Sequence, residues 1–258
     1  MYMAIDRKPE NGCEIQSSCC GRSRILCRLL VKKAADTEVE SDEEENELPR
    51  GTREALELMK PWLGTDRIGC GDSYFASVFT AQAFYEKGTR FIGVIKNSTR
   101  RYPMKPLSEE PREGRGHSLS MTSTFQNGSE VYDMMAVGWV DRNRRYFVST
   151  VGGNIPGTEQ VRLRWRARDG VSAQERKSVP MPCVVCDYYG CASMIDRHNR
   201  TRQADLGLER AFQVKEWSIR VNTTLLGMCV TDAYNLYRGS CGATQAVSCH
   251  DFFCALAE

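Results

Sequence analysis

The sequence contains no apolar run long enough to cross a membrane. A transmembrane helix needs about 20 mostly apolar residues, and no segment of the 258-residue chain approaches that length. The N-terminal region also lacks the apolar core of a signal peptide. We therefore expect an intracellular protein that neither inserts into a membrane nor is exported.

Net charge is also nearly absent. The formal charge is only +2, so the whole molecule has no strong field to attract nucleic acid, and any basic surface must come from local clustering. An acidic run at 36–47 (DTEVESDEEENE) offsets many of the Lys and Arg residues elsewhere. Like-charge blocks are usually solvated, so we predict an acidic disordered loop at 36–50.

A second paired-cysteine motif is missing. The chain has 12 Cys, but only Cys183 and Cys186 form a CxxC, while Cys249, His250 and Cys254 stand alone in the C-terminal tail. A structural zinc usually joins two close ligand pairs at set spacing. We predict reduced thiols and no zinc site.

The first part of the chain alternates strand and helix signals. Short apolar runs at 13–33 flank Gly21, which predicts a hairpin with a glycine turn. The segment 51–62 has apolar residues at helical spacing, with Thr52 in N-cap position and Pro61 at its end. We expect two strands followed by an amphipathic helix.

A strand, a helix and a second strand follow at 66–72, 78–87 and 91–96. This order predicts a βαβ crossover with parallel strands. Open α/β sheets place their sites at the carboxyl ends of strands, where Asp72 stands. Taken alone, Asp72 would be interpreted as the N-cap of a helix starting near Ala76.

The remainder is predicted as a β meander, an insertion and a helical end. Alternating segments with turn signals fill 118–150, and 152–182 is rich in Gly, Pro and charge with one strand near 161–165. Helical composition begins at 187 and is strongest at 219–237, before Gly239. No internal repeat is present.

Several motifs, in order, resemble the piggyBac-type DDE/DDD transposase family. The segment GDSYFAS at 71–77, followed by a helix and FIGVIKNSTRRYP at 91–103, is similar to the family's sequence around its second catalytic Asp. Together the matches cover about residues 7–238, as a partial and degenerate member. The others are KPENGCEIQ at 8–16, RRYFVST at 144–150, DYYGCASMIDRHNR at 187–200 and DAYNLY at 232–237.

The resemblance implies an α/β, ribonuclease H-like transposase core, a mixed sheet flanked by helices, with a β-rich insertion. Asp72 should then end an interior strand. The expected division is 1–35 for the first strands, with the first catalytic strand truncated, 36–50 for the acidic loop, 51–150 for the core, 151–186 for the insertion, 187–239 for the closing helices and 240–258 for the tail.

In this family three carboxylates hold two divalent cations, Mg²⁺ or Mn²⁺, that promote attack on a phosphodiester. The resemblance gives Asp72 the second carboxylate's role as catalytic residue and metal ligand. The first Asp lies before the Lys8 segment in the family and is absent here. At the third position stands Ser193, with Asp196 three residues later as a vestigial substitute. We therefore expect productive metal binding to be lost.

The resemblance also makes the basic clusters candidates for DNA-backbone contacts, although charged side chains are more often simply solvated. Alternating arginines at 162, 164, 166 and 168 would share one face of a strand. His198 lies among the basic residues of the later cluster. The candidate DNA-binding residues are Lys96, Arg100, Arg101, Arg162, Arg164, Arg197, Arg200 and Arg202.

Three functions fit these observations. The first is a piggyBac transposable element-derived protein in the nucleus, catalytically inactive and retaining DNA affinity. The second is an active transposase or nuclease encoded by a longer gene that supplies the first Asp. The third is a non-catalytic protein-interaction module. DNA and a second copy of the chain are the candidate partners.

Overall fold

The structure is a computed structural model that describes residues 13–33, 48–109, 114–152, 155–157, 159–168, 171–212, 215–242 and 246–258. The acidic run at 36–47 and the segment around Lys8 lie outside these ranges. The chain forms two compact units, Ser41–Gly190 and a second made of Met1–Glu40 with Cys191–Glu258. Across the described ranges, no helix has the length and hydropathy that crossing a bilayer requires.

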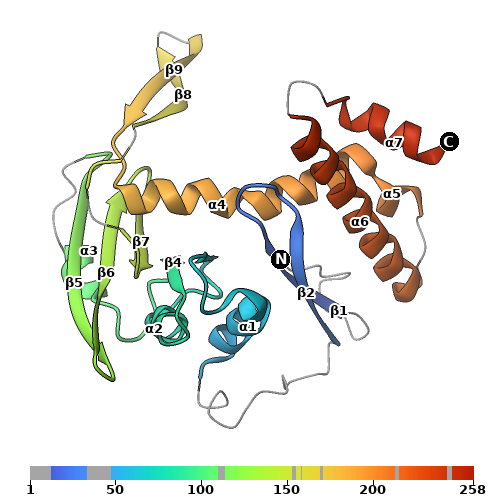
Figure 1. The fold of residues 1–258 in the computed structure, drawn as a ribbon. Coiled ribbons are helices and arrows are strands. Elements are labelled where there is room, and N and C mark those ends of the chain that lie inside the picture. The colour runs from blue at the N-terminus through green and yellow to red at the C-terminus, as the bar shows by residue number, and fades with distance from the viewer. Residues whose placement is uncertain are drawn as a thin grey trace. The chain divides into compact units, whose positions relative to one another are not determined.

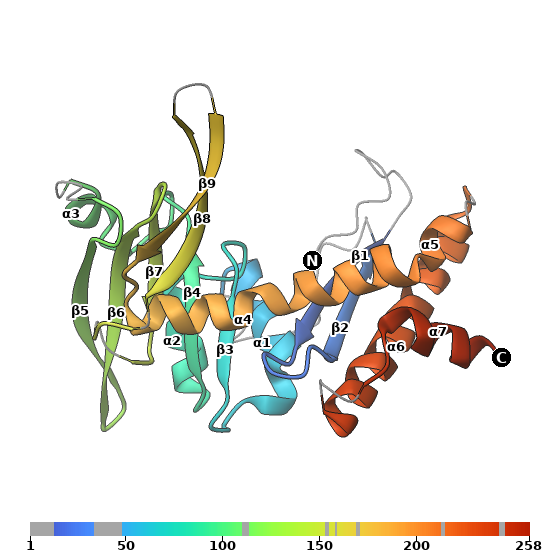
Figure 2. The same cartoon turned by 90° about the horizontal axis from the view of Figure 1, so that it is seen from above.

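The unit at 41–190 is built on a five-stranded mixed sheet with strand order β3-β4-β7-β6-β5, seen from above in Figure 2. The predicted βαβ crossover is confirmed, because β3 pairs in parallel with β4 and a helix connects them. The predicted meander is confirmed as well, because the other pairs are antiparallel. The elements are β3 (Ile68–Gly71), α2 (Val78–Glu86), β4 (Arg90–Ile95), β5 (Ser118–Asn127), β6 (Glu130–Val140) and β7 (Arg144–Ser149).

The expectation that Asp72 ends an interior strand is wrong within the described part of this sheet. There β3 is the terminal strand and pairs only with β4. Its exposure alternates, with Ile68 47% exposed and Gly69 and Gly71 buried. The sequence pattern predicted that β3 runs parallel to β4 and where β3 ends. Whether β3 is an interior or a terminal strand depends on which other strands pair with it.

Glycines on β3 and β4 let aromatic rings lie directly on the sheet. A Cβ at Gly69 would lie 2.5 Å from Phe84 of α2, and one at Gly71 would lie 2.8 Å from Phe91. The Phe84 and Phe91 rings are 5.0 Å apart and almost fully buried. This face of the sheet, covered by α2 and α1 (Arg50–Met59), holds the main apolar core.

The opposite face of the sheet packs against the first turns of α4 (Cys183–Arg200). Trp139 and Phe147 are fully buried, and their rings contact Tyr189 and Tyr188 at 6.2 and 5.3 Å between centroids. Trp139 Nε1 also donates to the Pro180 carbonyl at 2.9 Å. Helices therefore flank both faces, as the fold class predicted.

The predicted N-cap of helix α1 is corrected in this unit. Helix α1 has Pro49 rather than Thr52 at its N-cap. Thr52 lies inside the helix, where its hydroxyl bonds that of Thr80 in α2 at 2.8 Å, so a helix contact outweighed its capping preference. A 3-10 turn (Lys60–Trp62) follows α1, and α3 (Met104–Glu109) precedes the meander.

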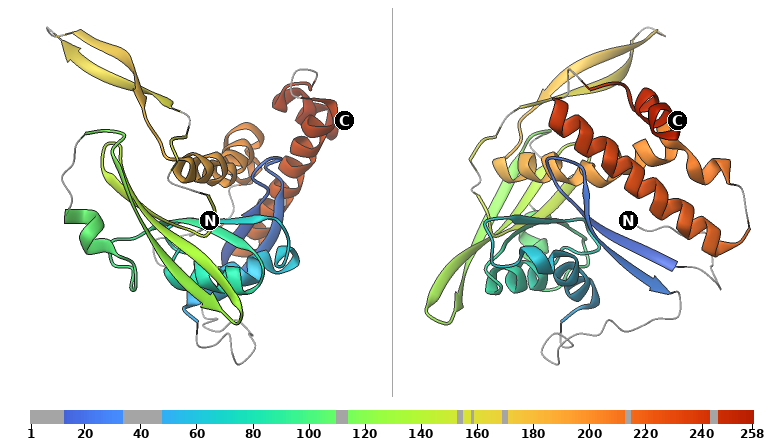
Figure 3. Two further views of the ribbon diagram at one scale, coloured as in Figure 1. Left: turned by 60° about the vertical axis from the view of Figure 1, so that its left-hand side comes forward. Right: turned by 45° about the vertical axis from the view of Figure 1, so that its right-hand side comes forward.

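The insertion contains two strands, where the sequence indicated one. The strands β8 (Gln160–Arg168) and β9 (Val171–Val179) form an antiparallel hairpin that projects from the five-stranded sheet (Figure 3). Strand β9 (VSAQERKSV) is mostly polar, so it has no apolar alternation of its own and becomes a strand by pairing with β8.

The second unit holds the predicted N-terminal hairpin, β1 (Cys13–Cys19) and β2 (Leu26–Lys33). Ile15 and Met228 form a small core with neighbouring apolar side chains of β2 and α6. Figure 1 shows the hairpin beside α6. The other elements are a π-helical segment (Thr201–Leu206), α5 (Leu208–Ala211), α6 (Trp217–Cys241) and α7 (Cys249–Ala257).

Two glycine substitutions should change stability in opposite directions. Gly93→Ala would place a Cβ 2.5 Å from Ala76 Cβ and 3.0 Å from the Gly71 carbonyl oxygen. We expect the free energy of unfolding to fall by about 1–3 kcal/mol. Gly190, inside α4, has no atom within 4 Å of such a Cβ. Because alanine favours a helix more than glycine does, Gly190→Ala should raise the free energy of unfolding by about 0.5–1 kcal/mol. Urea denaturation measures both, and a Gly93→Ala protein as stable as the parent would contradict the close packing.

Candidate functional site

Asp72 directly follows β3 and is exposed. Its Oδ1 accepts hydrogen bonds from the backbone N–H of Tyr74 at 2.8 Å and of Phe75 at 3.4 Å. Its carbonyl accepts from the Ala76 N–H at 2.9 Å. Asp72 therefore closes a turn with its own side chain.

The alternative interpretation of Asp72 as a helix N-cap is wrong. Helix α2 begins at Val78, and its N-cap is Ser77, whose Oγ accepts from the Thr80 N–H at 3.0 Å. A turn separates Asp72 from the helix, so the cap is formed by the residue next to the helix. Asp72 instead orders the loop between strand and helix.

Buried Glu54 of α1 holds the same loop from the other side. Its Oε2 accepts from the Tyr74 hydroxyl at 2.8 Å, and its Oε1 pairs with Arg50 Nε at 2.7 Å. Glu54 has no exposed surface, and a buried carboxylate needs such partners. The sequence reasoning missed this residue because only the packing of α1 brings it to the loop.

The pKa of Tyr188, in the first turns of α4, is raised in this region. Burial raises the pKa of its hydroxyl above the usual value, and the nearby Cys70 and Asp72 raise the pKa further because an anion disfavours ionisation. Cys70 Sγ lies 3.9 Å from the Tyr188 carbonyl oxygen. The first turns of α4 thus lie against the carboxyl end of β3.

Three predicted basic residues, Lys96, Arg100 and Arg101, are exposed on the turn after β4. We call them the basic edge. Because β3 and β4 are parallel, with Gly71 opposite Gly93, Asp72 and Lys96 follow strand ends at the same edge of the sheet. The Arg101 guanidinium lies 4.6 Å from the ring centroid of Phe79, in the first turn of α2. The basic edge and the N-terminus of α2 are therefore neighbours.

Helix α4 and the following π-helical segment carry five further candidate residues named in the sequence analysis. Ser193 is partly buried, whereas Asp196, Arg197 and Arg200 are exposed. Arg202 differs from its neighbours, because only 1% of its side chain is exposed and its guanidinium pairs with Glu209. Burial also lowers its pKa. Arg202 therefore does not belong to an exposed basic surface.

Strand β8 carries Arg162 and Arg164, whose Cα atoms pair with those of Lys177 and Glu175 on β9. The strand's existence is confirmed, and the role of its arginines stays a prediction.

The residues present do not fit a pair of divalent cations. Such a pair needs several oxygen ligands converging from different elements. In the described part of the chain, no three His, Cys, Asp or Glu side chains gather to hold a metal ion. Asp72 Oδ1 accepts hydrogen bonds from its own loop, and the hydroxyl of Ser193 adds no negative charge.

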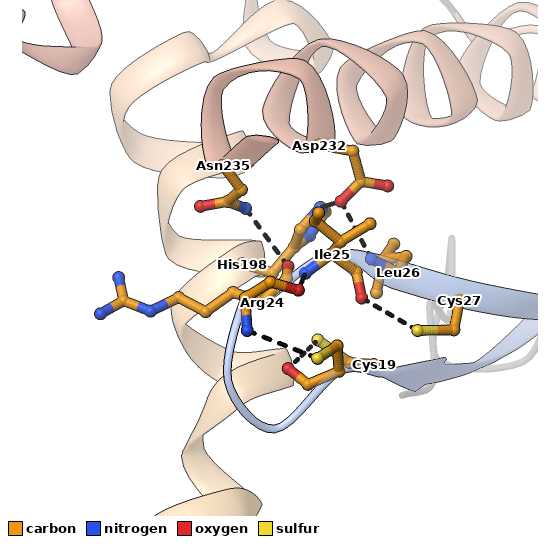
Figure 4. A network of polar contacts seen from close by, with 10 residues as sticks. Cys19, Arg24, Ile25, Leu26, Cys27, His198, Asp232 and Asn235 are labelled. Carbon is orange, nitrogen blue, oxygen red and sulfur yellow. Dashed lines mark hydrogen bonds and ion pairs between the residues drawn. The ribbon is translucent and has the colours of Figure 1, made fainter. Parts of the chain in front are cut away.

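The second unit contains a buried polar cluster that sequence reasoning did not detect (Figure 4). Asp232 Oδ1 of α6 accepts from the Leu26 N–H at 2.9 Å and lies 3.1 Å from Nε2 of the fully buried His198. Asn235 Nδ2 donates to the Arg24 carbonyl at 3.2 Å. These contacts join α4, α6 and the hairpin, so His198 has a structural position rather than one in a basic surface.

Comparisons with known proteins agree with this architecture. A family model described as Transposase IS4 matches residues 2–234. The structure is similar to a piggyBac transposase solved as a synaptic complex with hairpin DNA, with a TM-score of 0.67 and 15% sequence identity. The match covers 99% of this chain and 47% of that chain, so this chain spans about half its length. No curated protein matches the chain by sequence.

Asp72 offers a test of its local role. Asp72→Ala removes the acceptor for two backbone N–H groups, so we expect the free energy of unfolding to fall by about 0.5–2 kcal/mol. Asp72→Asn keeps an acceptor oxygen and should change the free energy of unfolding by less than about 0.5 kcal/mol. Urea denaturation of the two variants measures the difference, and equal losses would show that the turn does not depend on this oxygen.

Proposed function

Because the chain belongs to the Transposase IS4 family, piggyBac type, we propose that it is a transposase-derived protein that binds DNA without cleaving it. The main support is the position of the basic edge. Lys96, Arg100 and Arg101 are exposed where β3 and β4 end, beside the N-terminus of α2. Such a protein would act in the nucleus.

The chemistry of the basic edge suits a phosphate backbone. Lys and Arg side chains neutralise phosphates and release the counterions bound to DNA. The N-terminus of α2 adds backbone N–H groups and the positive end of the helix dipole. Contact with Phe79 restricts the Arg101 side chain, so less conformational entropy is lost when it binds. None of these contacts reads the base sequence.

Loss of cleavage follows from the acidic residues. Two-metal phosphoryl transfer needs anionic oxygens that bind the cations and offset their charge. Ser193 stands where the resemblance puts the third carboxylate, and Asp72 already accepts two backbone hydrogen bonds. Asp196 is exposed on α4 and lies one turn from Ser193. A binding role is therefore favoured over a catalytic role.

Arg197 and Arg200 on α4, with Arg162 and Arg164 on β8, extend the proposed DNA-binding set. We leave Arg202 out of it because its guanidinium is buried against Glu209. The similar piggyBac structure contains hairpin DNA, which makes a hairpin duplex a suitable probe.

Salt-dependent binding tests the basic edge. The triple variant Lys96→Ala, Arg100→Ala, Arg101→Ala should bind a hairpin duplex more weakly in fluorescence anisotropy. The slope of log affinity against log salt should become shallower by up to about 3, because each phosphate contact contributes about 0.9. The matched control replaces Arg67, Lys87 and Arg90, three exposed cations at the other ends of β3, β4 and α2. Equal losses in both triples, or no binding at low salt, would refute the proposed interface.

Cleavage is tested separately. The purified chain, incubated with the same duplex and Mg²⁺ or Mn²⁺, should leave both strands intact on a denaturing gel. Nicking that is removed by Asp72→Ala but retained in Asp72→Asn would contradict the non-catalytic assignment and would trace the loss to the turn, since Asn keeps the turn. Nicking that is removed by both substitutions would overturn the non-catalytic assignment.

A further inference from the structure

A cleft opens on the face of the five-stranded sheet that also carries α2. Its volume is about 340 Å³, within the roughly 300–1,000 Å³ that small-molecule sites occupy. Strands β5 and β6 supply most of its lining, and Ser123 pairs there with Met134 across the two strands. Val78, in the first turn of α2, and the loop 101–103 line the rest together with Val148 of β7. The cleft therefore lies within a single unit of the chain.

Flexible apolar side chains line much of this cleft. Met121, Met134 and Met135 are among them, together with Phe125. Met121 is 40% exposed, although Met134 on the paired strand belongs to the apolar core. An unbranched thioether side chain adapts to the shape of its partner, and covering this surface removes apolar area from water. The cleft therefore suits an alkyl chain better than a rigid polar ligand.

Arg101 gives the cleft a positive charge. It is the one charged residue among the described residues that line the cleft. Its guanidinium lies 4.6 Å from the ring centroid of Phe79. Its backbone has a φ of 61°, in the left-handed region that non-glycine residues rarely adopt. Such conformations persist where the surroundings fix them, and they are common at ligand sites. The cleft is therefore complementary to an anionic group.

The loop that carries Arg101 is held in place before any ligand binds. Tyr102 is buried, and its hydroxyl donates to the Phe147 carbonyl oxygen at 2.9 Å and to that of Val137 at 3.3 Å. These bonds fix the loop 101–103 to β7 and β6. Ordering the site should therefore cost little free energy when a ligand binds.

We propose that this cleft binds an aliphatic carboxylate, with its alkyl chain against Met121, Met134 and Met135 and its carboxylate at Arg101. A guanidinium presents N–H donors in a planar fork that matches the two oxygens of a carboxylate. Arg101 also belongs to the basic edge, but the cleft would bind its ligand without DNA. The inference can therefore fail independently of the proposed DNA binding.

NMR of the full chain, labelled with ¹³C at its methionine methyl groups and free of DNA, tests the proposal. Octanoate should shift the signals of Met121, Met134 and Met135 in a saturable way and leave those of Met194 and Met228 in place. Octanol has the same chain without the charge, so it should bind at least about fivefold more weakly, because it cannot form the charge-assisted bond. Octylammonium should bind no better than octanol. Equal affinities for the three probes, or no saturable shift with octanoate, would overturn the proposal.

Arg101→Gln should lower the affinity for octanoate to that for octanol and leave the affinity for octanol unchanged, a split that a general loss of structure would not produce. The matched control Arg100→Gln removes the neighbouring exposed cation, which does not line the cleft. It should change both affinities by less than about twofold, because salt screens exposed charges. An equal loss of octanoate binding in the two variants would contradict the position of the carboxylate.

Ser123→Phe should block the cleft, because Ser123 lines it on β5 and an added ring fills space without removing an apolar side chain. The saturable octanoate shifts should be lost. The control is Thr124→Phe, since Thr124 is outside the cleft lining and its hydroxyl donates to Asp133 on the exposed surface. Octanoate binding that survives Ser123→Phe, or that Thr124→Phe removes equally, would overturn the site. If Ser123→Phe loses its native circular dichroism, the Arg101→Gln comparison decides the proposal alone.

Discussion

The close packing of α2 on the parallel pair β3 and β4 is the constraint on which the candidate site depends. Phe84 and Phe91 occupy space that a side chain at Gly69 or Gly71 would fill. The helix can therefore lie directly on the two strands, and the crossover keeps them parallel. As a result, the loop of Asp72, the N-terminus of α2 and the basic edge all lie where the two strands end. A side chain in place of either glycine would push the helix away from this edge.

The proposed preference for binding over cleavage rests on the charges of the candidate site residues. In two-metal chemistry, clustered carboxylates attract cations that offset the phosphate charge. Asp72 is engaged by two backbone N–H groups, and Ser193 stands in the sequence where the resemblance puts a third carboxylate. The basic edge supplies positive charge directly to the same region. A protein with this arrangement can hold a phosphate backbone through side-chain cations, without the ions that the resemblance implies.

Local signals predicted the elements that carry their own apolar pattern. The strand before Asp72, helix α2, strand β4 and the meander each alternate or repeat clearly, and each is found where the sequence indicated it. Strand β9 was missed because its polar residues form a strand only by pairing with β8. Residue type alone indicated caps at Thr52 and, without the resemblance, at Asp72, but Thr52 bonds Thr80 of another helix and Asp72 closes a turn. Residue preferences are weak wherever a tertiary contact offers a better partner.

The sequence by itself determined the family and most of the order of strands and helices, because these follow from residue identity and spacing along the chain. The tertiary structure decided which of the predicted basic residues are exposed and which are buried in polar contacts. It buried Arg202 against Glu209 and joined His198 to Asp232, while the basic edge remains exposed. Exposure and ion pairing depend on which distant segments pack together, and a linear pattern of residues does not contain that information.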